Sequence, residues 1–175
     1  MTQNSQERIY QKIDIHDFAS SFREGDIAEN IVRDYLESEG WTVSVIPQPK
    51  EKERGDFHIF HPAYCSNHGY DIEVKCDKRA EETYKFFLET GVNYYDKEGV
   101  SPGWAEYTVA KEIYYYFPKA GTIWVIPSES IKSNLSDWEK KYPKRKAQNK
   151  KWHGIGVLVP AIEMLRIRTK RIELR

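Results

Sequence analysis

The chain has 175 residues, with 27 basic and 27 acidic side chains and a formal net charge of zero. This balance excludes a simple polycation that coats nucleic acid, and a content of 31% charged and 14% aromatic residues is typical of a folded domain. No apolar run approaches the roughly 18 residues of a membrane-spanning helix, so we expect no membrane partner.

The N-terminal residues and the cysteines indicate the domain organisation and the cellular compartment of the protein. Residues 1–15 are polar and have no signal-peptide pattern, which predicts a flexible N-terminus followed by one domain over residues 16–175. Cys65 and Cys76 are too few for a disulfide framework and indicate a reducing compartment. We therefore expect a cytoplasmic protein, in the host cytoplasm if the source is a virus.

The first half of the chain predicts one helix followed by strands. Apolar residues recur at helical spacing over residues 24–39, and Gly40 ends the pattern. Alternating or apolar runs bounded by glycine, proline and charged loops then predict strands at residues 41–46, 55–60, 69–77 and 84–89.

The second half continues with a mixture of helices and strands. Ser101 and Pro102 are typical of an N-cap and a first helical position, so a helix is predicted from there to Phe117. The apolar run at residues 122–126 predicts a central strand buried on both faces. A short helix follows from Ser128, and the C-terminal part fits either two strands or a strand and a helix. This order predicts an α/β sandwich around a mixed sheet.

The strand predicted at residues 69–77 contains the most informative pattern. Successive side chains alternate across a strand, so Glu73 and Lys75 lie on one face, and Asp56 opens the preceding strand. Two carboxylates suit Mg²⁺ or Mn²⁺, and a lysine beside them can orient a metal-bound water or offset the charge of a phosphate. The solvated face of a half-buried antiparallel sheet has the same alternation and is the alternative interpretation.

These residues, in this order, resemble the PD-(D/E)xK nuclease superfamily, which includes phage and viral nucleases and Holliday-junction resolvases. The resemblance covers residues 24–128 and implies the restriction-endonuclease-like fold, with an αβββαβ core and a mixed central sheet flanked by helices. Glycine stands at position 55, where the family name has proline. The matching residues are Gly25, Glu29, Gly40, Trp41, Gly55, Asp56, Glu73, Val74 and Lys75.

The resemblance also implies a role for each matched site residue. Asp56 and Glu73 would ligate Mg²⁺ (or Mn²⁺), with the Val74 carbonyl as a third oxygen. Lys75 would stabilise the attacking water or the phosphate, and Glu29 would bind behind the metal, through water or a second ion. A solvated helix glutamate is the alternative for Glu29. A metal and a lysine together offset the charge that develops in a phosphodiester transition state.

Three further patterns accompany this core. Glu89, the segment 101–104 and Thr108 resemble a less general pattern of small phage-type members of the family. A histidine and cysteine cluster at residues 58–68 does not have the ligand spacing of common zinc sites. Residues 140–151 contain seven basic side chains and no acidic one, which suits a phosphate backbone, although a solvated loop has the same composition. The candidate DNA-binding residues are Lys52, Arg54, Lys144, Arg145, Lys146, Lys150 and Lys151.

These patterns predict a metal-dependent endonuclease that hydrolyses DNA phosphodiester bonds, with junctions and flaps as candidate substrates. Two alternatives stay open: a non-catalytic nucleic-acid-binding or assembly module on the same fold, and an enzyme directed at RNA. Many relatives dimerise to cut two strands, so the resemblance also implies a homodimer.

Overall fold

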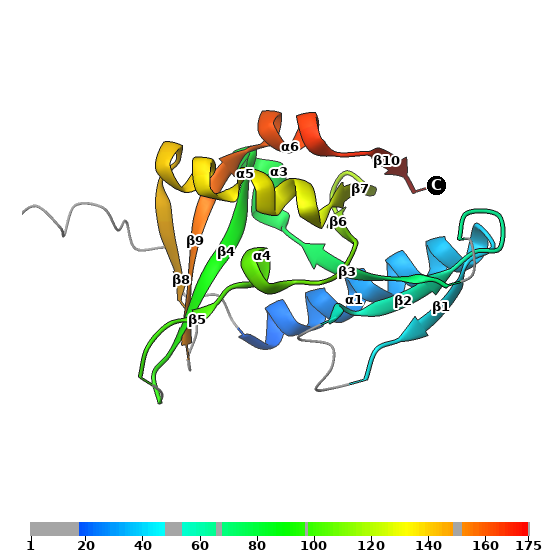
Figure 1. Cartoon of the computed structure of the whole chain (residues 1–175), viewed down its shortest axis with the longest axis horizontal. Helices are drawn as coiled ribbons and strands as arrows, with labels where there is room; N and C mark the ends of the chain where they lie inside the picture. Colours follow the sequence, from blue (N-terminus) through cyan, green and yellow to red (C-terminus); the bar gives the residue numbers. More distant parts are fainter. Residues whose placement is uncertain (1–17, 48–53, 66–67, 97, 149–151, 175) are drawn as a thin grey trace, which may run out of the picture.

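The computed structural model describes residues 18–47, 54–65, 68–96, 98–148 and 152–174. Its strands form two sheets, with helix α1 on one side of the first sheet and helices α5 and α6 on the other side, near the second sheet (Figure 1). The helices are α1 (Phe18–Ser38), α3 (Lys78–Thr83), α4 (Trp104–Tyr107), α5 (Ser128–Lys141) and α6 (Ala161–Ile167).

The first sheet is mixed. It has six strands in the order β1-β2-β3-β6-β7-β10. The pairing of β3 with β6 is parallel, and the other neighbours are antiparallel. The predicted α/β architecture, with a mixed central sheet flanked by helices, is therefore confirmed. These strands are β1 (Thr42–Val45), β2 (Phe57–Phe60), β3 (Tyr70–Cys76), β6 (Glu112–Phe117), β7 (Thr122–Pro127) and β10 (Lys170–Glu173).

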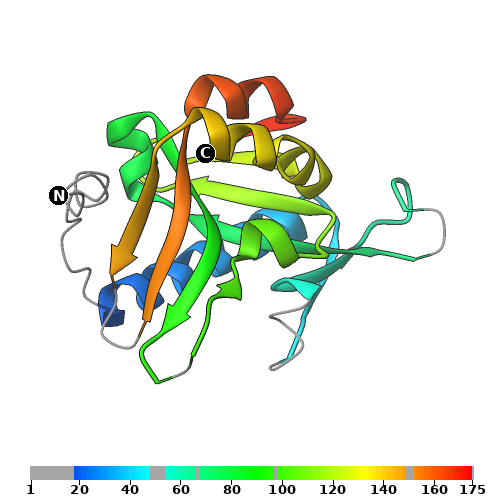
Figure 2. The ribbon, with the colours of Figure 1, turned by 60° about the vertical axis from the view of Figure 1, so that its left-hand side comes forward.

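The second sheet is antiparallel and has four strands in the order β5-β4-β9-β8. Its strands lie beside α3 and α4 in a view turned from that of Figure 1 (Figure 2). The long strand β4 pairs along its whole length with β9, with an irregularity between Glu89 and Gly91. The strands are β4 (Lys85–Tyr94), β5 (Ser101–Pro102), β8 (Lys144–Gln148) and β9 (Trp152–Pro160).

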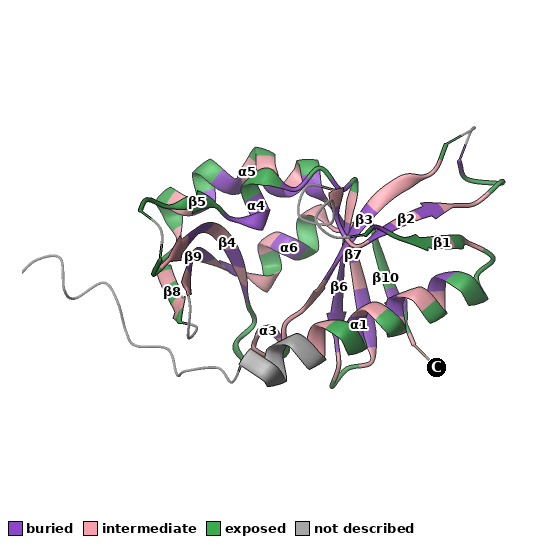
Figure 3. Cartoon of the chain, turned by 90° about the horizontal axis from the view of Figure 1, so that it is seen from below, coloured by how far each residue is buried: buried purple, intermediate pink, exposed green. Residues whose placement is uncertain are grey.

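Two hydrophobic clusters hold the layers together. The helix-side core packs α1 residues such as Val32 and Leu36 against Ile72 and Val74 of β3. The inter-sheet core packs Trp104 and residues of β4, β9 and α5 against the opposite face of the first sheet. Strand β6 contributes alternate residues to the two cores and is buried on both faces, which Figure 3 shows as an almost continuous buried segment above α1.

The helix predicted from Ser101 to Phe117 is wrong. Ser101 and Pro102 form the short strand β5, α4 spans a single turn that starts after Gly103, and Glu112–Phe117 is strand β6. Consecutive aromatic and β-branched residues favour a pleated surface, and a strand buried on both faces has no periodicity to distinguish it from a helix. This error hid the fact that the segment joins both cores.

The C-terminal part completes both sheets. Strand β9 lies in the second sheet and β10 closes the first one beside β7, with the short helix α6 between them. Part of the basic stretch 140–151 is also regular, since β8 pairs with β9. None of the described helices combines the length and the apolar character that a bilayer crossing requires.

Candidate active site

Asp56 lies directly before the first residue of β2, where a tight backbone conformation fixes its carboxylate. Gly55 has a φ of +104°, and a Cβ there would lie 2.5 Å from the Ile72 carbonyl oxygen, so only glycine fits. Proline, with its φ fixed near −65°, could not adopt this conformation. Asp56 donates its backbone N–H to the Ile72 carbonyl at 2.9 Å, and its Oδ2 accepts the Val74 backbone N–H at 2.6 Å.

Glu73 is the neighbour of Asp56 across the two strands. Phe57 pairs with Ile72 in antiparallel register, so the next pair outward is Asp56 and Glu73, whose side chains share one face of the sheet. That face is opposite the one that Ile72 and Val74 present to the helix-side core. The predicted alternation of β3 is therefore the one observed, and the two carboxylates belong to the side that faces the second sheet.

Lys75 forms an ion pair with Glu73 at this position. Burial alone would lower the pKa of the Lys75 ammonium, but the carboxylates of Glu73 and Asp56 outweigh that effect and raise the pKa above its ordinary value. The Lys75 Nζ also lies 5.3 Å from the centroid of the Trp104 ring, within range of a cation–π interaction. Lys75 is thus held as a cation between two carboxylates and an aromatic ring.

Glu89 reaches the same cluster from β4 of the second sheet. Its burial raises the pKa of the Glu89 carboxyl to about 7; the charge of Lys75 and the Trp104 backbone N–H oppose this rise, and Glu73 adds to it. Gly154 of β9 leaves the space for this side chain, because a Cβ there would lie 2.4 Å from Glu89 Oε2. A third carboxylate therefore lies within electrostatic range of the Glu73–Lys75 pair.

Helix α4 closes the cluster on the side of the second sheet. Gly103 allows the close approach of α4 to β4, since a Cβ there would lie 2.3 Å from the Glu89 carbonyl oxygen. Tyr107 of α4 has a raised pKa because of burial and of the nearby charges of Glu73 and Glu89, with Lys75 opposing. Sequence reasoning did not place Tyr107 in the site, because its position depends on the single-turn length of α4.

Glu29 lies on the other side of the first sheet. Its half-buried side chain is on α1, three residues before Val32 and seven before Leu36, both of which pack in the helix-side core. Helix α1 contacts β3 from that side. The role of Glu29 behind a metal ion stays a prediction.

The predicted DNA-binding residues that the structure describes have different surroundings. On β8, Lys144 pairs with Glu139 at 2.8 Å, whereas Arg145 and Lys146 point to opposite faces of the strand. Arg54 donates two hydrogen bonds to the Asp71 carboxylate, at 2.6 and 2.8 Å. Three of the predicted residues, Lys52, Lys150 and Lys151, lie outside the described residues.

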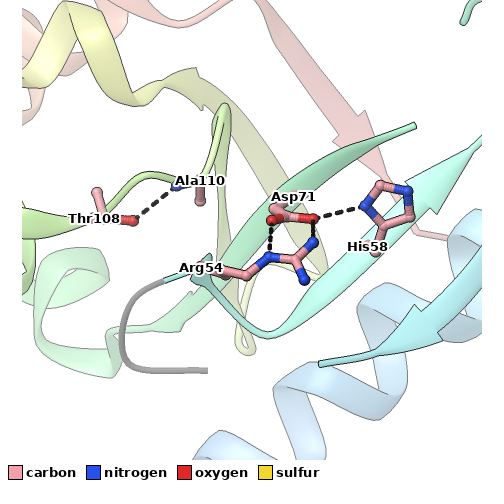
Figure 4. A network of polar contacts seen from close by, with 5 residues as sticks. All are labelled: Arg54, His58, Asp71, Thr108 and Ala110. Atoms are coloured by element: carbon pink, nitrogen blue, oxygen red, sulfur yellow. Dashed lines mark hydrogen bonds and ion pairs between the residues drawn. The ribbon is translucent and has the colours of Figure 1, made fainter. Parts of the chain in front are cut away.

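The Asp71 carboxylate organises a second polar network on β2 and β3 (Figure 4). It accepts the two hydrogen bonds from Arg54 and contacts His58 Nδ1 at 2.7 Å. Burial would raise the pKa of Asp71, but these partners outweigh it and lower the pKa. The network ties the start of β2 to β3, next to the turn that carries Asp56.

His61, another member of the histidine and cysteine cluster, packs its ring against Trp41 and Tyr64.

The fold and the cluster on β2 and β3 define an α/β protein with a mixed central sheet and a buried ion pair on one face of it. Neither a family model nor a curated protein matches the sequence. The structure is similar to that of a bacterial homing endonuclease, I-Ssp6803I, with a TM-score of 0.50 and 16% sequence identity. The similarity covers 65% of this chain and 73% of the endonuclease chain. At this identity it concerns the fold.

Proposed function

We propose that the protein is a metal-dependent endonuclease that hydrolyses DNA phosphodiester bonds. The observation that carries the proposal is the convergence of Asp56, directly before β2, with Glu73 and Lys75 of the adjacent strand β3. The similarity of the fold to that of an endonuclease supports the same function. Glu73 and Lys75 are one ion pair, and Asp56 is opposite Glu73 in the β2–β3 register and acts on the charge of Lys75.

The oxygen ligands available suit a hard divalent cation. Asp56 and Glu73 would hold Mg²⁺ or Mn²⁺ together with the Val74 carbonyl. Glu29 lies on the other side of the first sheet, so its predicted role is not part of this ligand set. Among the described residues no three His, Cys, Asp or Glu side chains form a ready-made cage. A site with few protein ligands is typical of Mg²⁺, which keeps several of its waters. When bound, such an ion acidifies a water and polarises the phosphate.

The protein's own side chains have separate tasks in this chemistry. Because the pKa of Lys75 is raised, Lys75 is a cation at neutral pH and serves as a donor to the phosphate or to the attacking water. Asp56 Oδ2 accepts the Val74 N–H, which holds the carboxylate in one orientation. The Trp104 ring lies 5.3 Å from the Lys75 Nζ and helps to hold the ammonium in place. These groups are held before substrate arrives, which favours stabilisation of the transition state.

Nicking of supercoiled plasmid, flaps and four-way junctions tests the proposal. We expect cleavage by the wild type in Mg²⁺ or Mn²⁺ and none in EDTA. Lys75→Ala should reduce the rate by at least about 100-fold, the usual loss when one preorganised donor is removed. Lys78→Ala removes an equal charge three residues further on, where the side chain is about half exposed and pairs with Glu24, and should leave the rate unchanged.

A parallel digest of RNA separates the two nucleic acids as substrates. Binding of DNA without cleavage of any substrate by the pure wild-type protein would contradict the nuclease proposal. That result would favour the non-catalytic binding or assembly module.

Sedimentation of the free and DNA-bound protein tests whether the protein forms a homodimer.

A further inference from the structure

A cavity of about 480 Å³ lies beside Lys75 of the candidate active site. Its lining combines residues of β3, β6 and α3 with residues of β4, β8 and β9, so both sheets contribute to it. Lys75 and Trp104 belong to this lining as well as to the candidate active site. A molecule in the cavity would therefore be next to the group proposed to contact the scissile phosphate.

Part of the cavity wall is aromatic and aliphatic. Phe87 and Leu158 are opposite each other in the β4–β9 register, and Trp104 and Tyr115 contribute rings from the other elements. The volume is within the range of about 300–1,000 Å³ that is usual for small-molecule sites. Flat rings of this kind stack on nucleobases without selecting among them, because every base has a π-face.

The remaining lining residues give the cavity a positive charge. Arg79, Lys85 and Arg145 join Lys75, whereas among the described residues that line the cavity only Asp77 carries a carboxylate. Asp77 is the N-cap of α3 and accepts the Ala80 backbone N–H at 2.9 Å. Cations beside aromatic walls complement a ligand with a flat apolar part and an attached phosphate.

Strand alternation separates Arg145 from its basic neighbours. Arg145 and Ala147 line the cavity, while Lys144 and Lys146 point to the other face of β8. Lys146 thus offers a matched control for Arg145, because it has the same charge on the same strand and does not line the cavity. The basic stretch of the sequence accordingly has two faces with different surroundings.

We propose that this cavity binds one unpaired nucleotide of the substrate strand, with its base against the aromatic walls and its phosphate at the cations. A base stacked and paired within a duplex cannot enter, so the protein would prefer strands with a bulged, flapped or terminal nucleotide. The inference rests on the proposed function in taking DNA as the substrate, but binding tests it without any cleavage.

Binding in EDTA is measured with two DNA duplexes that differ only in whether a single 2-aminopurine is bulged or paired. We expect the wild type to bind the bulged DNA about tenfold more tightly and to change its 2-aminopurine emission through stacking. Arg145→Gln should remove most of this preference, and Lys146→Gln should keep it. Leu158→Trp should abolish it by filling the cavity, and circular dichroism checks the fold of each variant.

Competition identifies which part of the nucleotide is bound. We expect a deoxynucleoside monophosphate to displace the bulged DNA at a concentration at least about tenfold below that of inorganic phosphate. Equal competition by phosphate would overturn the proposal, because the base would then make no contact. Equal affinity of the wild type for bulged and paired DNA would also overturn it.

The outcomes also separate this inference from the nuclease proposal. A preference for the bulge without cleavage in Mg²⁺ or Mn²⁺ would leave the nucleotide site standing and remove the nuclease. Metal-dependent cleavage without a preference for the bulge would support the nuclease proposal and overturn the nucleotide site.

Discussion

The two faces of β3 differ in the side chains that they carry, which are apolar on one face and charged on the other. Ile72 and Val74 face α1 in a dry apolar core, with exposures of 0% and 7%. Glu73 and Lys75 face the second sheet, where they pair with each other near Glu89. Removing charges from water costs free energy that their mutual attraction seldom restores in full. One face of the strand therefore stabilises the fold, and the other carries buried charges that the stability of the fold does not explain.

This comparison implies that changes on the two faces should separate activity from stability. The largest effect is expected for Asp56→Asn, on the polar face. The asparagine amide oxygen can still accept the Val74 N–H, so the fold should persist while a carboxylate ligand is lost. We expect kcat/KM for plasmid nicking to fall by about 1,000-fold, with a melting temperature close to that of the wild type. Asp137→Asn, at an exposed position on α5, is the control and should have no effect.

Leu36→Ala, in the apolar core, should have the reverse effect: it should lower stability and leave the activity of the folded protein unchanged. Leu36 is 1% exposed in the helix-side core, and its truncation leaves a cavity that costs about 3 kcal/mol in the free energy of unfolding. Urea denaturation measures the loss, and the activity per folded molecule should not change. Ile27→Ala, on the exposed side of α1, should cost less than about 0.5 kcal/mol. A large loss of activity in folded Leu36→Ala would show that the two faces are not independent.

Gly55→Ala should lower both stability and activity, because Gly55 packs against the backbone of Ile72 and directly precedes Asp56. The added Cβ would meet the Ile72 carbonyl at 2.5 Å, and a φ of +104° is strained for alanine. We expect a loss of about 2 kcal/mol in the free energy of unfolding and a fall in kcat/KM as Asp56 moves. Gly25→Ala in α1 meets no atom within 4 Å and should stabilise the protein by up to about 1 kcal/mol. A neutral Gly55→Ala would contradict the tight turn.

The smallest effect concerns the pH dependence that Glu89 contributes. Burial raises its pKa from 4.5 to about 7, so between these pH values the unfolded chain releases a proton that the folded chain keeps. The contribution of Glu89 to the free energy of unfolding therefore falls as the pH rises through this window. In EDTA, Glu89→Gln should stabilise the protein by up to about 2 kcal/mol at pH 8 and by almost nothing at pH 4. Glu98→Gln, at an exposed position, should show no such difference.

The elements that sequence reasoning predicted well are those with one clear period. The apolar stripe over residues 24–39 and the alternation of β3 each have one buried face, and α1 and β3 lie where these patterns indicated. Strand β6 was missed because Ile113 and Tyr114 are buried in different cores, which removes the alternation. Its residues also match a helical stripe by chance.

The candidate site divides in a similar way. Asp56, Glu73 and Lys75 could be grouped because neighbouring strands join them within a short stretch of sequence. The resemblance singled out Glu89, but not its nearness to these residues, because that depends on how the second sheet packs on the first. Arg54 was predicted for DNA from its charge, and its two hydrogen bonds to Asp71 come from a register that the sequence does not state.

The parallel pairing of β3 with β6 has a consequence for the order in which the chain assembles. Residues 77–111 must cross from one strand to the other, and this crossover contains β4, whose long partner β9 is near the C-terminus. Contacts so distant in sequence form late. Since Glu89 rests against Gly154 of β9, the surroundings of Glu89 are incomplete until β9 has left the ribosome, and products truncated before β9 would lack them.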